Sequence, residues 1–93
     1  MSANAPVLIT VVHSPACHFC DDAQAIVAAL ADEFPLKVDV VAATSPLGAR
    51  LVDEQRAPMY PLVLVDGEFF SFGRLSQKKL RRLLERRAVG SVA

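Results

Sequence analysis

The fold of this 93-residue chain is decided by the stretch Val7-Leu8-Ile9-Thr10-Val11-Val12-His13-Ser14-Pro15-Ala16-Cys17-His18-Phe19-Cys20-Asp21-Asp22. Residues 7–12 are mostly β-branched and nearly all apolar, which predicts a central strand that is buried on both faces. Both cysteines of the chain follow, two residues apart, where this strand gives way to a segment with helical periodicity. A Cys-x-x-Cys pair at such a junction indicates a redox dithiol.

Hydrophobic periodicity predicts the elements that follow the dithiol. Apolar residues at helical spacing predict a helix over residues 19–34, ended by Pro35. Alternation over residues 36–41 predicts an edge strand, and a strand–helix–strand unit requires a parallel pair with a right-handed crossover. A second helix over residues 46–56 is expected, with Ser45 as its N-cap and Pro46 at its first position. We expect Gly48 to weaken this helix. Its expected inner face consists of Leu47, Leu51 and Val52.

The C-terminal part of the chain predicts a hairpin and a final helix. Asp66-Gly67 separates residues 62–65 from residues 68–72, which is the signal of a β-hairpin with a two-residue type I′ turn. The last helix should open at Ser76, with Leu75 and Leu80 as a hydrophobic staple. Its expected inner stripe is Leu80, Leu83, Leu84 and Ala88, and Gly90 to Ala93 are expected to fray.

The resulting order is β-α-β-α-β-β-α, an α/β fold with a four-stranded mixed sheet and three helices. We expect one domain over residues 1–93, with an ordered core of about residues 6–89, because the chain can bury a single core. No apolar stretch approaches the roughly 18 residues that span a bilayer. Residues 1–6 carry no basic side chain, so no signal peptide is predicted and a cytoplasmic location is expected.

Three features of the chain together resemble a small glutaredoxin-like protein of the thioredoxin superfamily. They are Cys17-x-x-Cys20 after the first strand, Tyr60-Pro61 before the hairpin, and Gly73 after it. The resemblance covers nearly all of residues 6–89. It implies a thioredoxin/glutaredoxin-like fold and a thiol–disulfide oxidoreductase, an electron carrier of cell redox homeostasis that reduces protein or mixed disulfides. It also implies that Pro61 is a cis-proline opposite the dithiol, with Tyr60 pairing with a substrate backbone; Pro58 is the competing candidate.

The spacing of the cysteines assigns them different roles. Two intervening residues at a helix N-terminus place Cys17 beside unpaired amides and the positive end of the helix dipole, which lowers the pKa of its thiol. Cys17 is therefore the predicted nucleophile, and Cys20, one turn further on, is the predicted resolving thiol. His18 either favours the Cys17 thiolate when protonated or is an exposed loop residue, and Asp21 and Asp22 oppose the thiolate. Phe19 is either an apolar contact beside the dithiol or a core residue.

Metal and cofactor binding receive less support from the sequence. His13, Cys17, His18 and Cys20 lie within eight residues, whereas structural zinc sites bring two separated ligand pairs together, so no metal site is predicted. No tightly bound cofactor is expected. Some glutaredoxins hold an iron–sulfur cluster between two subunits through the first cysteine and glutathione, which leaves cluster carriage as an alternative. A second alternative is a thioredoxin-fold binding or redox-sensing module without turnover.

The resemblance weakens where glutathione would bind. Glutaredoxins often carry a lysine at the place of Ser14, and a Gly-Gly pair with acidic residues before the last helix. The corresponding stretch here is 72–76, in which Gly73, Arg74 and Ser76 are the candidate contacts for a thiol ligand. The expected reductant is therefore glutathione, another low-molecular-weight thiol or a thioredoxin-reductase-type enzyme, and the expected substrates are disulfide-containing proteins.

Charge is segregated along the chain. Residues 1–54 hold seven acidic and two basic residues, and residues 55–93 hold three acidic and eight basic ones. Such asymmetry can orient a partner or belong to solvated helix faces. The basic last helix carries no interleaved aromatic residues, and its leucines suit the core. We therefore expect no binding of nucleic acid. A monomer that does not bind membranes is also expected.

Overall fold

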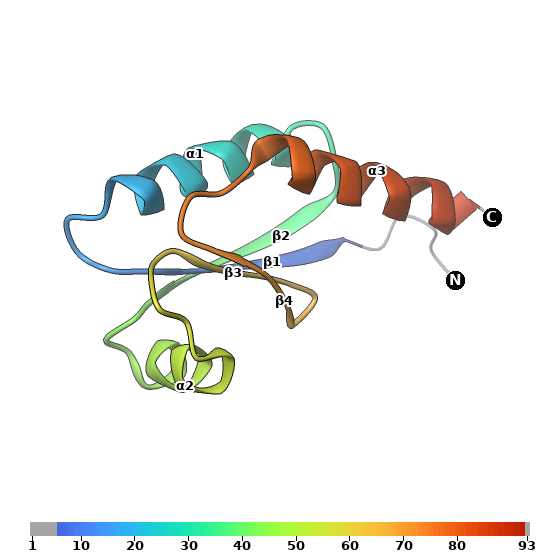
Figure 1. The fold of residues 1–93 in the computed structure, drawn as a ribbon. Helices are drawn as coiled ribbons and strands as arrows, with labels where there is room; N and C mark the ends of the chain where they lie inside the picture. The colour runs from blue at the N-terminus through green and yellow to red at the C-terminus, as the bar shows by residue number, and fades with distance from the viewer. Residues whose placement is uncertain (1–5, 93) are drawn as a thin grey trace.

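The computed structural model describes residues 6–92, and side chains as far as Arg87, and it shows seven elements in the predicted order (Figure 1). No helix in this described part of the chain is long and apolar enough to cross a bilayer. The elements are β1 (Val7–His13), α1 (His18–Ala31), β2 (Leu36–Ala42), α2 (Pro46–Gln55), β3 (Leu62–Val65), β4 (Glu68–Phe72) and α3 (Gln77–Val92).

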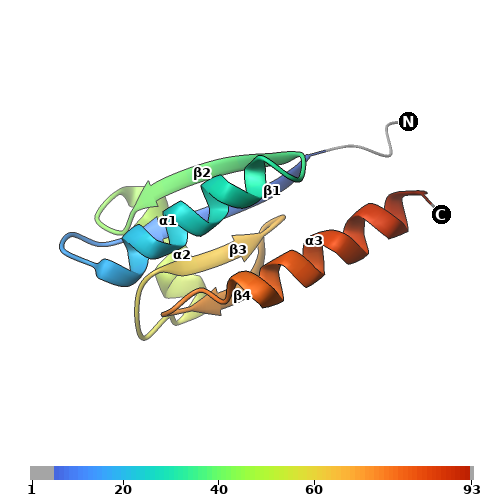
Figure 2. The same cartoon turned by 90° about the horizontal axis from the view of Figure 1, so that it is seen from above.

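The four strands form one mixed sheet in the order β2-β1-β3-β4. Strand β1 pairs in parallel with β2 and antiparallel with β3, and β3 pairs antiparallel with β4. Helices α1 and α3 cover one face of the sheet and α2 covers the other (Figures 1 and 2). The predictions of a central first strand and an edge second strand are therefore confirmed.

Two apolar cores lie on the two faces of the sheet. The larger core joins β1 and β3 to α1 and α3, and its fully buried members include Ile9, Val27 and Leu80. The smaller core consists of Val12, Leu62 and Leu64, packed against partly buried residues of α2 and its flanking loops. Because β1 contributes to both cores, its side chains are buried on both faces, as its composition predicts.

Helix α1 ends earlier than its periodicity predicts. The helix stops at Ala31 rather than at residue 34, and the amides of Glu33 and Phe34 both donate to the Leu30 carbonyl in the turn that follows. Pro35 explains the early end, because it has no amide to donate to the Ala31 carbonyl and its ring would clash with that carbonyl in a continued helix. Phe34 still packs against the larger core, so its apolar character predicted the right packing and the wrong secondary structure.

Helix α3 is longer than predicted and is capped as predicted. Ser76 accepts a hydrogen bond from the Lys79 amide at 3.2 Å, and Leu75 and Leu80 are both buried, as a hydrophobic staple requires. The helix continues to Val92, past Gly90, where the predicted frayed tail begins, whereas Ala93 and the side chain of Ala88 lie outside the described part of the chain.

Helix α2 approaches the β2–α2 loop so closely that only glycine fits at position 48. The Ser45 hydroxyl accepts a hydrogen bond from the Gly48 amide at 3.0 Å, which confirms the predicted N-cap. A Cβ atom at Gly48 would overlap the backbone carbonyl of Ala42. Leu47 is 45% exposed, so its predicted place on the inner face is wrong.

The turn between β3 and β4 contacts both the first strand and the last helix. Asp66 and Gly67 have φ values of 51° and 81°, as a type I′ turn needs. One Asp66 carboxylate oxygen accepts a hydrogen bond from the Leu8 amide at 2.9 Å, and the other pairs with Arg87 of α3. The Asp66 amide also donates to the Leu8 carbonyl at 2.7 Å. A single turn residue therefore contacts the first strand and the last helix.

A bidentate ion pair links the turn after α1 to α3. Two guanidinium nitrogens of Arg81 donate to the two carboxylate oxygens of Glu33, each at 2.6 Å. This hydrogen bonding, with the attraction of the opposite charge, lowers the pKa of Glu33 and raises the pKa of Arg81. A fork-to-fork pair of this kind has a defined geometry, and here it joins the turn after α1 to the exposed side of α3.

Replacing Gly48 tests the close approach of α2. On helix propensity alone, Gly48→Ala should stabilise the protein by about 1 kcal/mol. The overlap with Ala42 instead predicts a net loss of roughly 1–3 kcal/mol, measured as the free energy of unfolding in urea. Ala49→Gly, the reverse exchange at the exposed neighbouring position, is the matched control and should cost only about 1 kcal/mol. A stabilised Gly48→Ala variant would contradict the packing described here.

Replacing Glu33 tests the ion pair through its pH dependence. Because the pKa of Glu33 is lowered in the folded state, its contribution is complete above its ordinary pKa of 4.5 and is lost as the pH falls through the lowered value. The difference in unfolding free energy between the parent and Glu33→Gln should therefore be positive at neutral pH and disappear in acid. Glu68→Gln, the same exchange at an exposed position of β4, is the matched control for the substitution itself. A difference between the parent and Glu33→Gln that stays unchanged in acid would contradict the ion pair.

Candidate active site

The two cysteines lie at the junction between β1 and α1, and the Cys17 sulfur caps the N-terminus of the helix. Ala16 adopts a left-handed conformation with φ of 53°, and Cys17 is extended, with φ of −112° and ψ of 106°. In this geometry the Cys17 Sγ accepts a hydrogen bond from the Cys20 amide at 3.1 Å. An amide donor and the positive end of a helix dipole both favour negative charge on that sulfur.

The two cysteines differ in their access to solvent. They are joined in a disulfide, with Cα atoms 5.2 Å apart, so the structure holds the oxidised form. Cys17 is half-buried, whereas Cys20 is only 1% exposed because it belongs to the packed face of α1. An incoming sulfur can therefore reach Cys17, while Cys20 can reach only Cys17.

Pro61 follows a cis peptide bond and Pro58 does not. The cis bond joins Tyr60 to Pro61, and among residues 6–92 it is the one cis peptide bond. The Pro61 carbonyl accepts a hydrogen bond from the Gly73 amide at 3.0 Å. Within the same described residues, no hydrogen bond engages the backbone of Tyr60. The Tyr60 backbone can thus pair with an extended chain laid across it.

An open groove of about 520 Å³ runs from Cys17 to this proline loop. Phe19 and Met59 line it with exposed apolar side chains, 45% and 48% exposed respectively. Phe19 therefore lies beside the dithiol and not in the core. The remaining lining residues are Ser14, Ala16, Cys17, His18 and Tyr60, so the groove offers an apolar surface directly at the reactive sulfur.

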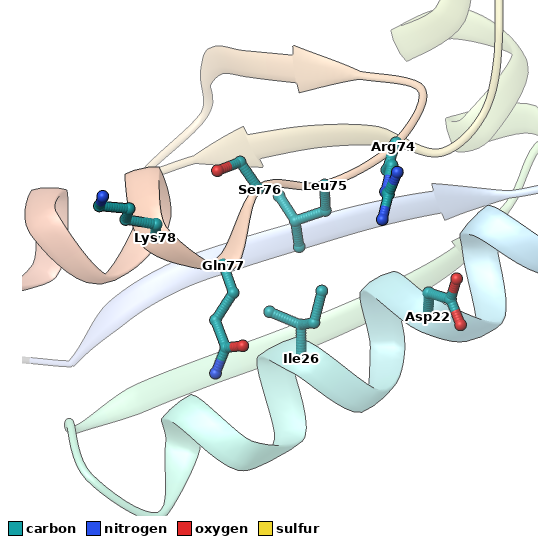
Figure 3. A pocket seen from close by; sticks show the side chains of 7 residues that line it. All are labelled: Asp22, Ile26, Arg74, Leu75, Ser76, Gln77 and Lys78. Atoms are coloured by element: carbon teal, nitrogen blue, oxygen red, sulfur yellow. The ribbon is translucent and has the colours of Figure 1, made fainter.

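A second groove, of about 660 Å³, separates α1 from the start of α3 (Figure 3). Asp22 of α1 lies on one wall, and Arg74 and Lys78 come from the opposite side, where Figure 3 shows Arg74 directed toward the groove. Ile26 and Leu75 supply apolar side chains between these walls. Cys17 does not line this groove, so any ligand held there would reach the sulfur only by extending along α1.

Of the three residues predicted to contact a thiol ligand, two line the second groove and one lines neither groove. Arg74 and Ser76 line the second groove, and the Ser76 hydroxyl is already the cap of α3. Gly73 is buried and has a φ of 77°, and a Cβ atom there would come within 2.6 Å of the Met59 sulfur. Gly73 therefore shapes the turn that holds Met59 and Pro61, and it lines neither groove.

Only one of the two histidines lines the Cys17 groove. His18 is exposed and lines the Cys17 groove, whereas His13 ends β1, where its carbonyl accepts a hydrogen bond from the Ala43 amide at 2.8 Å. In the part of the chain that the structure describes, no three histidine, cysteine or carboxylate side chains converge as metal ligands.

Two residues of the site escape sequence reasoning. Met59 covers Gly73 and forms a wall of the Cys17 groove, yet a methionine before Tyr-Pro carries no recognisable signal. Ala16 takes a left-handed conformation that alanine rarely adopts. Its place directly before the first cysteine, after Pro15, is the one hint that a sharp turn is needed there.

Comparisons with known proteins address the fold. No protein-family model and no curated protein matches the sequence. Among solved structures, a thioredoxin-like protein of Clostridium perfringens aligns with a TM-score of 0.72 and 13% identity over 92% of this chain and 74% of its own. A point mutant of a thioredoxin from Halobacterium salinarum aligns with a TM-score of 0.70 and 18% identity over 92% of this chain and 78% of its own.

A protein of unknown function from Staphylococcus aureus matches nearly end to end, covering 96% of this chain and 98% of its own, with a TM-score of 0.64 and 16% identity. At sequence identities this low, the matches support a shared fold and nothing about function. The sheet order, the placement of the three helices and these alignments together show that the chain has the fold of the thioredoxin superfamily.

Proposed function

We propose that this protein is a thiol–disulfide oxidoreductase, a glutaredoxin-like dithiol electron carrier that reduces disulfides through Cys17 and Cys20. The observation that carries the proposal is the placement of the two sulfurs. The Cys17 Sγ is accessible and accepts a hydrogen bond from the Cys20 amide at the start of α1. Cys20 is buried, and its sulfur is close enough to bond to the Cys17 sulfur. This arrangement separates an attacking thiolate from a resolving thiol.

The reaction starts from the reduced dithiol. The Cys17 thiolate attacks one sulfur of a substrate disulfide, that S–S bond breaks, and the departing thiolate takes a proton from solvent. Cys20, once deprotonated, then attacks the Cys17 sulfur and releases the second substrate thiol. The substrate gains two electrons and two protons, and the protein is left with the Cys17–Cys20 disulfide that the structure holds.

The substrates we infer are disulfides in proteins. The groove at Cys17 is lined by Phe19, Met59 and Tyr60, which suit apolar side chains, and the Tyr60 backbone is available for strand-like pairing. Glutathione is an anionic tripeptide, and no lysine or arginine lines this groove. These features favour an extended polypeptide as the partner at the sulfur itself.

The reductant we propose is a low-molecular-weight thiol, with a thioredoxin-reductase-type enzyme as the alternative. Arg74 and Lys78 on the wall of the second groove can attract a carboxylate, and Asp22 opposite them can attract an amino group. Delivery of two electrons and two protons by either reductant would return the Cys17–Cys20 disulfide to the dithiol. A cytoplasmic setting belongs to the same proposal, because a reducing compartment keeps the dithiol in the attacking form.

Variants of the two cysteines test the mechanism. Cys17→Ser should abolish reduction of a protein disulfide, whereas Cys20→Ser should accumulate a mixed disulfide between Cys17 and the substrate, visible by intact-mass spectrometry. Turnover is measured with glutathione plus its reductase and, separately, with a thioredoxin reductase, which identifies the reductant. Full activity of Cys17→Ser would refute the mechanism, and no turnover with either reductant or any disulfide would favour a binding or sensing module.

Alkylation of the reduced protein tests the assignment of Cys17 as the attacking thiol and Cys20 as the resolving thiol. Because Cys17 is accessible and Cys20 is 1% exposed, a neutral alkylating reagent should modify Cys17 at least roughly tenfold faster at neutral pH. The rates are measured by mass spectrometry on the single variants Cys17→Ser and Cys20→Ser, each of which leaves one thiol. Equal rates would contradict the assignment of Cys17 as the attacking thiol.

A further inference from the structure

Strand β2 is an edge strand that presents two different surfaces. Val38 and Val40 are 38% and 48% exposed, and they lie beside Ile9 and Val11 of β1, on the face covered by α1 and α3. Lys37 and Asp39 lie beside Leu8 and Thr10 and therefore belong to the face covered by α2. Both are exposed, and no ion pair within residues 6–92 engages either of them.

The two edges of the sheet differ in regularity. Strand β2 pairs with β1 without interruption over all seven residues, from Leu36 to Ala42. The opposite edge strand, β4, carries an irregularity opposite Val63 and Leu64, where Phe70 is left over in the register. Bulges protect an edge against pairing, and a regular edge leaves a row of backbone donors and acceptors open to another strand. Figure 2 shows β2 as the outermost strand on its side.

The charges on β2 fit a second copy of the same strand. In an antiparallel pair related by a two-fold axis through Val38, Lys37 of each copy lies opposite Asp39 of the other. On the other face, Val38 meets its own mate and Val40 meets Leu36, so the exposed valines become cross-strand apolar pairs. Opposite charges and apolar side chains placed directly across a strand pair both stabilise it.

The neighbouring two-fold registers lack this match. A two-fold axis through Asp39 places the two Asp39 carboxylates opposite each other, and an axis through Lys37 does the same to the two ammonium groups. An axis through Val40 sets Asp39 against Val41. The alternation of side chains restricts the axis to residue positions, because directly opposed residues of an antiparallel pair share one face. The register centred on Val38 is therefore the one that pairs both charges.

We propose that β2 pairs with β2 of a second copy in this register and forms a two-fold symmetric dimer with a continuous eight-stranded sheet. A short strand pair buries little area, so the association is weak and depends on concentration. This dimer replaces the monomer expected from the sequence. It leaves the chemistry untouched, because antiparallel pairing sends the carboxyl ends of the two β1 strands, and with them the two dithiols, in opposite directions.

The test exchanges the two charges. Sedimentation equilibrium of the oxidised protein, in which both cysteines are occupied, should show the mass rising from 10.0 kDa toward twice that value between micromolar and millimolar concentration. Lys37→Asp and Asp39→Lys should each raise the dimer dissociation constant by roughly tenfold, since each creates two like-charge contacts. The double variant Lys37→Asp/Asp39→Lys should restore association.

The control is Arg82→Asp on the exposed face of α3, which changes the net charge as much as Lys37→Asp does and should leave the dissociation constant unchanged. All of these variants should reduce disulfides at the parental rate per chain. A mass of 10.0 kDa at every concentration would overturn the proposal. So would a dimer that is insensitive to the single exchanges, or one that the double exchange fails to restore.

Discussion

The burial of β1 is the constraint on which the rest of the structure depends. A strand that is covered on both faces must satisfy every backbone amide and carbonyl through its neighbours, because water cannot reach them. Strand β1 does so by pairing with β2 on one side and with β3 on the other. The first of these pairs requires a crossover helix, so α1 must start where β1 ends. The dithiol occupies that start, and its position follows from the sheet.

The candidate active site combines parts that reach the same edge of the sheet from distant places in the sequence. Cys17 follows β1, whereas the Tyr60–Pro61 bond precedes β3, the antiparallel neighbour of β1. Antiparallel pairing brings the end of one strand to the beginning of the other. Gly73 reaches the same place after β4 and holds the Pro61 carbonyl through its amide. Rigid strands thus position three loops around one sulfur, which is how a small domain can hold a precise site.

Much of this arrangement could be predicted from the sequence, because local signals agreed with the fold. The Asp66-Gly67 turn, the Ser45 and Ser76 caps and the alternation along β2 each depend on short-range chemistry that a single chain displays. Leu47 shows where such reasoning fails. Its spacing suited an inner face, but the smaller core takes Leu51 and Val52 from α2 and leaves Leu47 in solvent.

The features that could not be predicted depend on contacts between elements. Gly48 weakens a helix by propensity, and only the nearby carbonyl of Ala42 shows why no larger residue fits. Met59 became part of the site because Gly73 leaves room for its sulfur. The left-handed Ala16 opposes its own backbone preference. For Gly48 and Met59 the deciding atom belongs to another segment, and periodicity along one segment carries no information about it.

The Asp66 turn, at the end of the sheet opposite to the dithiol, has a consequence for engineering. Exposed hairpin tips usually accept inserted residues, tags or whole domains. Here the tip carboxylate binds both the amide of Leu8 and the guanidinium of Arg87, so lengthening the loop would release the first strand and the last helix together. The turn between α1 and β2 is held in a similar way, because Glu33 pairs with Arg81 of α3 and the Pro35 carbonyl accepts a hydrogen bond from the Val7 amide. Both turns at this end of the sheet therefore connect the first strand or the sheet to α3, and neither is a suitable place for a fusion partner.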